Sequence, residues 1–188
     1  MGVGSTGTSA AESLQITTRI GCRNACAYCP QALLVGSYAR RSRESVLSFE
    51  DFRACVDKVP TDVSIHFSGM SEPWLNADCT RMVEYAHESG HELHVFTTAV
   101  GMSPSDVDAL SHLSFAEFVV HLPSAEGYER IAMGEGYLSV IGLLAADADA
   151  ARAAGRGGRR GDRQSDRAVG VRVDRRERAG RLGCLRAG

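Results

Sequence analysis

The feature of this sequence best suited to chemistry is a group of cysteines near the N-terminus. Three of the six cysteines fall in the stretch RIGCRNACAYCPQALL, with the spacing Cys22-x3-Cys26-x2-Cys29. Soft thiolates select zinc or iron–sulfur clusters as their metal partners. A structural zinc site takes four ligands, whereas three thiolates are the right number for a [4Fe–4S] cluster that keeps one iron open. The stretch therefore indicates a metal centre and favours the open cluster.

None of the other cysteines and histidines is well supported as a fourth metal ligand. Cys55 and Cys79 lie at helical spacing on apolar faces, and we interpret both as small residues of the core. Cys184 lies in a segment of unusual composition near the C-terminus. His66 or His121 could complete a zinc site, although nothing in the spacing requires either of them.

Composition sets broad limits on the function. The 188 residues carry a formal net charge of −2, and 44% of them are hydrophobic. This suits one domain with a buried core and does not favour nucleic acid as a partner. No apolar run approaches the roughly 20 residues of a membrane span, and residues 1–13, expected to be disordered, lack the parts of a secretory signal. We therefore expect a cytoplasmic protein with reduced thiols and no membrane partner.

The C-terminal segment, residues 145–188, has a composition of its own. After residue 150 it holds twelve of the twenty arginines and no aromatic residue, Ile, Met or Pro. Such a segment cannot bury enough apolar surface to offset its ordering entropy, so we expect a disordered, Arg/Gly/Ala-rich low-complexity tail. One interpretation is a basic arm that touches nucleic acid. The favoured interpretation is a GC-rich gene read out of frame, because natural arms usually mix Lys with Arg and the only lysine here is Lys58.

Residues 14–144 alternate between strand and helix signals. Apolar and β-branched patterns predict strands at 14–20, 62–68, 91–98 and 115–122. Ser48, Asn76 and Ser103 are residues that cap helices, and each stands before a helical pattern; a fourth helix is expected to start in GEGYLSVIGLLAA.

This repeat of about 30 residues per βα unit predicts an α/β fold with parallel strands and right-handed crossovers. Function collects at the C-terminal ends of such strands. The four loops that follow the strands, which include CRNACAYC and SGMSEP, are therefore expected to share one rim and to form a composite site.

The cysteine triplet, placed directly after the first strand of a βα series, resembles the radical S-adenosylmethionine (radical SAM) superfamily. Tyr28 supplies the aromatic residue that this motif usually has before its last cysteine. The resemblance covers residues 14–144. It implies a partial (β/α)6-type radical SAM barrel, of which about four βα units are recognisable in the chain.

The resemblance also implies a chemistry. Cys22, Cys26 and Cys29 would each bind one iron of a [4Fe–4S] cluster, and the open iron would bind the amino nitrogen and carboxylate oxygen of SAM. An electron from the reduced cluster would cleave SAM to methionine and a 5′-deoxyadenosyl radical, which abstracts hydrogen from a substrate. The implied partners are SAM, an electron donor such as flavodoxin or ferredoxin, and a substrate that the sequence does not identify. No catalytic residue is assigned beyond the cluster ligands.

The stretch SGMSEP looks like the second signature of that family, a Gly-Gly-Glu-Pro type loop whose backbone holds the amino group of SAM. Gly69 and Glu72 match in character, whereas Met70 and Ser71 stand where the family commonly has glycine. We assign Gly69, Ser71 and Glu72 to cofactor binding, with Glu72 able to pair with an ammonium. The alternative is an ordinary turn between a strand and a helix.

Strand periodicity adds further candidates. His66 and His121 alternate with apolar neighbours, so both would point into the barrel mouth if the apolar residues face the helices. The resemblance implies a polar residue near the SAM carboxylate or ribose in the fourth-strand loop, where His121 falls. Thr98 at the end of the third strand and Tyr28 before the last cysteine are further candidates for cofactor binding. The alternative for the histidines is a hydrogen-bonded place in the core.

Two other functions stay open beside the radical SAM enzyme. One is a non-catalytic iron–sulfur or zinc-binding module. The other is an inactive truncated fragment, because a six-unit barrel needs about 180 to 190 residues at roughly 30 per unit and the fifth and sixth units are not recognisable.

Overall fold

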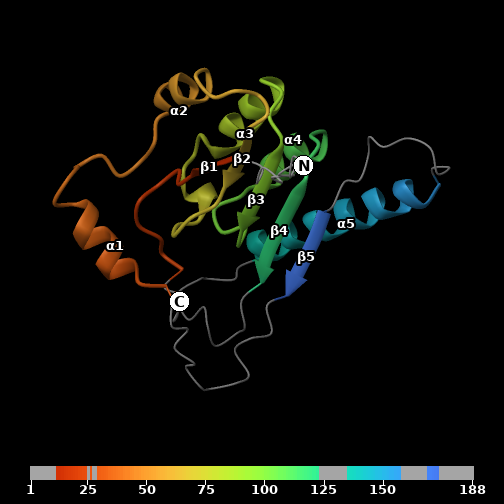
Figure 1. Ribbon diagram of the computed structural model, residues 1–188. Helices are drawn as coiled ribbons and strands as arrows, with labels where there is room; N and C mark the ends of the chain where they lie inside the picture. The colour runs from red at the N-terminus through yellow and green to blue at the C-terminus, as the bar shows by residue number, and fades with distance from the viewer. Residues whose placement is uncertain (1–11, 25, 27–28, 123–134, 158–168, 174–188) are drawn as a thin grey trace, which may run out of the picture.

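The computed structural model describes residues 12–24, 26, 29–122, 135–157 and 169–173, and its strands form one parallel sheet (Figure 1). The strands are β1 (Ser13–Ile16), β2 (Ser64–Phe67), β3 (Leu93–Thr97), β4 (Glu117–Leu122) and β5 (Val169–Val173). They lie side by side in chain order, and each neighbouring pair is parallel. The α/β fold with parallel strands predicted from the sequence is confirmed, and β5 joins the four expected strands.

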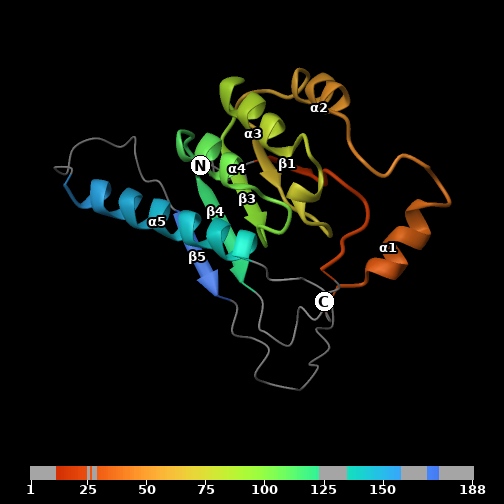
Figure 2. The ribbon, with the colours of Figure 1, turned by 180° about the vertical axis from the view of Figure 1, so that it is seen from behind.

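Helices connect these strands, and α3, α4 and α5 cover one face of the sheet. They are α1 (Gln31–Tyr38), α2 (Phe49–Val56), the 3-10 helix η1 (Pro73–Leu75), α3 (Cys79–Glu88), α4 (Pro104–Ser111) and α5 (Glu135–Gly157). Figure 2 shows α3, α4 and α5 in front of the strands, whereas Figure 1 shows the strands in front from the opposite side. A parallel pair needs such a crossover, because the chain must return to the same end of the sheet before the next strand begins.

The core lies between the sheet and these helices. Ile65, Phe67 and Val95 are fully buried on the helix side of β2 and β3. On α3 the residues predicted to face inward are all buried with no exposed surface: Cys79, Met82, Val83 and Ala86. The apolar residues of the strands and of the helices therefore pack together in one layer, and this packing fixes the positions of the strand ends.

Two of the three predicted helix caps are confirmed. The Ser48 side chain accepts a hydrogen bond from Asp51 N at the start of α2. Ser103 and Asp106 form a complete capping box at the start of α4, which satisfies backbone N–H groups that have no partner within the helix.

The prediction that Asn76 caps the third helix is wrong. The cap residue of α3 is Asp78, and its side chain makes no capping hydrogen bond. Asn76 is buried instead, and its amide nitrogen donates to Thr18 O at 3.0 Å and Leu47 O at 2.9 Å. Its Oδ1 still accepts a hydrogen bond from Asp78 N at 3.0 Å, a contact of the capping kind, although the helix begins two residues later than the prediction placed it.

Helix α1 was not anticipated from the sequence. It begins two residues after Cys29 and has no buried residue, and Figure 1 shows it standing apart from the sheet and the other helices. The apolar side chains of Leu33 and Val35 are 71% and 40% exposed. Because no face of α1 packs on the core, its sequence lacks the amphipathic pattern that predicts a helix.

The C-terminal segment contains secondary structure. Helix α5 runs through residue 145, where a tail was expected to begin, and β5 at Val169–Val173 pairs with β4 over five residues. The division into residues 1–13, 14–144 and 145–188 stays a prediction. None of the helices in the described part of the chain has the length and hydrophobicity that crossing a membrane requires.

Candidate functional site

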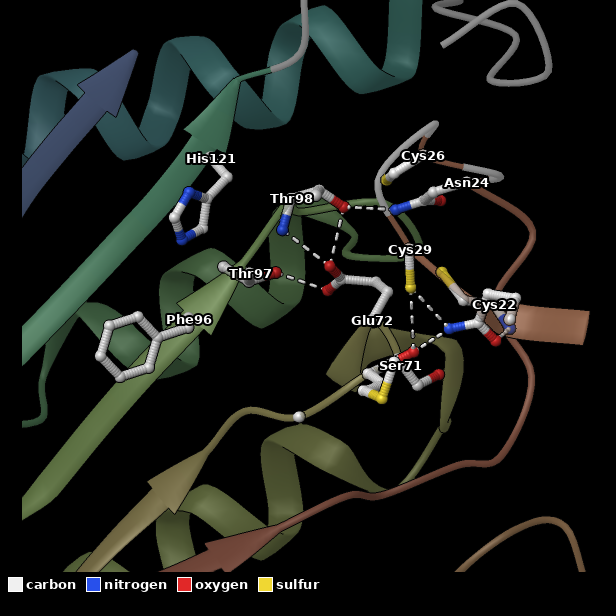
Figure 3. A pocket seen from close by; sticks show the side chains of 13 residues that line it. Cys22, Asn24, Cys26, Cys29, Ser71, Glu72, Phe96, Thr97, Thr98 and His121 are labelled. Atoms are coloured by element: carbon white, nitrogen blue, oxygen red, sulfur yellow. Dashed lines mark hydrogen bonds between the residues drawn. The ribbon is translucent and has the colours of Figure 1, made fainter. Parts of the chain in front are cut away.

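The loops at the C-terminal ends of β1, β2 and β3, together with the end of β4, enclose a cavity of about 310 Å³ (Figure 3). Eight of the residues assigned to a site from the sequence line it: Cys22, Cys26, Cys29, Gly69, Ser71, Glu72, Thr98 and His121. Tyr28, the ninth, lies outside the described residues. The expected shared rim is therefore present, although the roles of its residues stay predictions.

The three cysteines are half-buried free thiols on one side of this cavity. Burial raises the pKa of Cys22, and the backbone N–H groups of Asn24 and Glu72 act in the opposite direction by hydrogen bonding to its sulfur. The Gln31 amide nitrogen donates to Cys29 Sγ at 3.2 Å. The hydrogen bonds favour the thiolate form, although burial outweighs them at Cys22 and its pKa is raised overall.

Gln31 also joins the loop that holds Cys22, Cys26 and Cys29, here called the cysteine loop, to the loop after β2. Its amide oxygen accepts a hydrogen bond from Cys22 N at 3.2 Å, and its amide nitrogen donates to Met70 O. The Ser71 hydroxyl adds a second connection between the two loops, because it donates to Gly21 O at 3.2 Å. Sequence reasoning missed Gln31, whose only signal was its position two residues after the last cysteine of the motif.

Gly69 is required by the conformation of the loop after β2. Its φ is +110°, a value that side chains rarely allow, and a Cβ atom at this position would overlap Thr17 Oγ1. Only glycine fits this combination without strain. The loop can therefore bring its backbone close to whatever fills the cavity.

Glu72 is the centre of the hydrogen bonding at this site. It is 3% exposed. Its Oε1 accepts hydrogen bonds from Trp74 N at 3.3 Å and from the Thr97 hydroxyl, and its Oε2 accepts from both the N–H and the hydroxyl of Thr98 at 2.7 Å. These bonds tie the loop after β2 to the end of β3. The pairing of Glu72 with a ligand ammonium stays a prediction.

The electrostatics of Glu72 reflect two opposing effects. Burial raises the pKa of its carboxyl group, while the hydrogen bonds from Thr97, Thr98 and Trp74 lower it. The charge of Glu72 in turn contributes, after burial, to the raised pKa of Tyr137. The Tyr137 hydroxyl donates to Thr98 O at 3.0 Å, so α5 also reaches this network.

Asn24 is a second residue that sequence reasoning missed. It is 2% exposed and its amide nitrogen donates to Thr98 Oγ1 at 2.8 Å, which connects the cysteine loop to the end of β3. Its Oδ1 is a buried acceptor without a hydrogen-bond partner. The same is true of Ser68 Oγ, in the loop after β2. An Asn inside a cysteine motif carries no periodic signal, so only the fold reveals this contact.

The two candidate histidines have different surroundings. His121 on β4 lines the cavity near Phe96. His66 on β2 is not among the residues that line it; its ring stacks on His94 with centroids 4.2 Å apart, and its Nε2 lies 3.0 Å from Ser64 Oγ. The placement of His121 agrees with a ligand contact. His66 is hydrogen-bonded, as in the alternative, but it is half-buried and not part of the core.

The other cysteines that were weighed as ligands lie away from the cavity. Cys79 is completely buried on α3, as predicted for a core residue. The prediction that Cys55 is also a core residue is wrong, because it is exposed on α2. The buried face of α2 includes Phe52 and Val56, and Cys55, next to the last residue of this short helix, lies outside that face.

The donor set fits a soft metal centre better than a preformed site for a single ion. Among the described residues, no group of three or more His, Cys, Asp and Glu side chains is arranged to hold a metal ion. Three thiols nevertheless line one cavity, and thiolates prefer iron–sulfur clusters or zinc. Gly69 at the cavity wall and the unpartnered Oδ1 of Asn24, which also lines the cavity, are what a polar cofactor beside such a centre would use.

Comparisons with known proteins bear on the fold. No family model and no curated protein matches the chain. Among solved structures, it is similar to BtrN in complex with AdoMet and 2-DOIA, with a TM-score of 0.52 and 14% identity over 75% of this chain and 55% of that chain. A structure of SeMet BtrN in an open conformation matches with a TM-score of 0.48 and 14% identity, over 65% of this chain and 55% of that one. The chain thus spans about half the length of BtrN and has a similar α/β fold.

Proposed function

We propose that this chain is the cluster- and SAM-binding part of a radical SAM enzyme. The observation that carries the proposal is the meeting of three cysteines with Gly69 and His121 at one cavity. These residues come from three separate parts of the sequence and lie at the C-terminal edge of a parallel sheet, where ligand sites of such folds occur. The similarity in fold to BtrN, whose structure contains AdoMet, supports SAM as the ligand.

Each part of the site has a distinct task in this proposal. The thiolates of Cys22, Cys26 and Cys29 hold a [4Fe–4S] cluster. When bound, the cluster supplies the electron for reductive cleavage of SAM, and the 5′-deoxyadenosyl radical released from SAM abstracts a hydrogen atom from the substrate. The backbone at Gly69 would hold the amino group of SAM, and His121 would contact its carboxylate or ribose.

The protein also shapes the site through Glu72. Its hydrogen bonds with Trp74, Thr97 and Thr98 hold the loop after β2 against β3. This keeps the Gly69 backbone in place before the ligand arrives, which lowers the entropy lost on binding.

Anaerobic reconstitution with iron and sulfide tests the proposal. The protein should bind four iron atoms and develop the broad visible absorption of a cluster. SAM should then change the electronic spectrum, and dithionite or a reduced flavodoxin or ferredoxin should yield 5′-deoxyadenosine. Replacing any one of Cys22, Cys26 and Cys29 by Ala should abolish iron binding. Cys55→Ala is the matched control, because Cys55 is exposed on α2 away from the cavity.

The competing functions give different results in this experiment. A non-catalytic iron–sulfur module would hold iron through the same cysteines but show no spectral response to SAM. A zinc module would exclude iron, and an inactive fragment would respond to SAM without forming 5′-deoxyadenosine. Iron binding that survives all three single substitutions would overturn the proposed site itself.

A further inference from the structure

Asn24 lies in the middle of the cysteine loop, between two of the proposed cluster ligands, and its side chain reaches the end of β3. Its amide nitrogen donates to Thr98 Oγ1 at 2.8 Å, as the dashed line in Figure 3 shows. Hydrogen bonding from the backbone N–H groups of Asn24 and Glu72 lowers the pKa of Cys22, against the larger effect of burial, which raises it. The two N–H groups come from different loops, so the position of each relative to the sulfur depends on what holds the loops together.

A directional chain of hydrogen bonds provides that connection. The Thr98 hydroxyl donates to Glu72 Oε2 at 2.7 Å. A hydroxyl has one proton, so Thr98 can only accept from Asn24. The amide of Asn24 must therefore turn its nitrogen towards Thr98, and Oδ1 points away from it as a buried acceptor without a partner.

The direction of these hydrogen bonds excludes the flipped orientation of the Asn24 side-chain amide. A flipped amide would place Oδ1 of Asn24 against an oxygen of Thr98 whose proton is already bound to Glu72. Glu72 is likewise fixed, because its Oε2 also accepts the backbone N–H of Thr98 at 2.7 Å. Glu72, Thr98 and Asn24 thus form one connected unit between the sheet and the cysteine loop.

We propose that Asn24 is a positioning residue for Cys22: the Glu72–Thr98–Asn24 chain holds the Asn24 backbone N–H on the Cys22 sulfur and so sets the electron density of that ligand. Hydrogen bonds to ligand sulfur atoms raise the reduction potential of iron–sulfur clusters. The inference rests on the proposed function for the identity of the metal centre. The anchoring of the loop, however, is a property of the protein alone.

The first test uses the protein without iron, and measures hydrogen–deuterium exchange of peptides that cover residues 20–29. Asn24→Asp keeps the shape of the side chain but cannot donate to Thr98, and Thr98→Val keeps the shape of threonine without the hydroxyl. Each should speed exchange by about three- to tenfold, the factor that one net hydrogen bond contributes to a local opening equilibrium. Thr98→Ser retains the hydroxyl and should restore slow exchange.

Thr80 provides a matched control. Its hydroxyl also accepts from a nitrogen, Trp74 Nε1, and donates to a carboxylate, that of Asp106. It is not among the residues that line the cavity. Thr80→Val should leave exchange over residues 20–29 unchanged. Exchange in Asn24→Asp equal to wild type, or Thr98→Ser as fast as Thr98→Val, would overturn the anchoring.

The second test measures the reduction potential of the reconstituted cluster. Thr98→Val, which changes no charge, should shift the potential to more negative values, while Thr98→Ser and Thr80→Val should not. Faster exchange without a shift would overturn the influence on Cys22. If wild type forms no cluster, the proposed function fails, and the exchange experiment still decides whether Asn24 anchors the loop.

Discussion

Replacing Gly69 by alanine tests the geometry of the loop after β2 most directly. The φ of Gly69 is +110°, and a Cβ atom there would overlap Thr17 Oγ1. The substitution therefore adds two separate costs, one from the backbone conformation and one from the overlap with Thr17.

The size of each cost follows from general values. A side chain in such a sparsely populated backbone region costs about 1–3 kcal/mol, and forcing extra atoms into a packed position costs about another 1–3 kcal/mol. Gly69→Ala should then lower the free energy of unfolding by about 2–6 kcal/mol, a large part of the roughly 5–15 kcal/mol that holds a domain of this size together.

Two other glycines separate these contributions. Gly90 has a φ of +87°, but the nearest atom to a Cβ there is Thr61 Cγ2 at 4.0 Å. Gly90→Ala should therefore cost only the backbone part, about 1–3 kcal/mol. Gly36 lies in α1 with no atom within 4 Å of such a Cβ, and Gly36→Ala should stabilise the protein slightly, by up to about 1 kcal/mol.

Urea unfolding of the metal-free protein under reducing conditions, followed by circular dichroism, measures these differences. In the Gly69→Ala background, Thr17→Ala should recover the overlap part of about 1–3 kcal/mol, seen as a coupling energy in a double-mutant cycle. A Gly69→Ala protein as stable as Gly90→Ala, or no coupling with Thr17, would refute the close approach between Gly69 and Thr17, which directly follows β1.

Three other outcomes are expected. Burial and the nearby His94 lower the pKa of His66 from its usual 6.5. The neutral ring therefore contributes to stability above about pH 6.5, and this contribution is lost as the pH falls through the lowered pKa. His66→Gln should flatten the decline of the urea midpoint between about pH 7 and pH 5. Ser103→Ala removes the capping box of α4 and should cost about 1 kcal/mol in urea unfolding. Iodoacetamide should label the exposed Cys55 in the native protein but not the fully buried Cys79, whose pKa is raised well above its ordinary value by burial; mass spectrometry distinguishes them.

The sequence predicts well the features that follow from the spacing of apolar residues along the chain and from the common direction of parallel strands. Alternation located four strands, and helical spacing placed Met82 and Val83 in the core because a helix must turn its apolar stripe inward. The loops with Gly69 and His121 could be assigned to one rim, since parallel strands share the direction of their C-terminal ends. These inferences need no knowledge of a specific contact.

The features that could not be predicted depend on tertiary contacts. Helix α1 has no buried face, so it leaves no periodic pattern. Asn76 lies two residues before the cap of α3, where its Oδ1 accepts from Asp78 N. Its amide nitrogen bonds the carbonyl groups of Thr18 and Leu47, which the sequence does not reveal. Cys55 has the spacing of a core residue, but the buried face of α2 is formed by Phe49, Phe52 and Val56 and leaves Cys55 outside it.

Glu72 shows why the motif alone understates the site. From the sequence it is a carboxylate in a loop, and a ligand ammonium is a reasonable partner for it. In the structure its two oxygens each accept one backbone N–H and one hydroxyl, from Trp74, Thr97 and Thr98. An amide in its place would turn an N–H towards one of two backbone donors that cannot rotate away. The need for a carboxylate at this position is thus explained by the loops it joins, whatever the cavity binds.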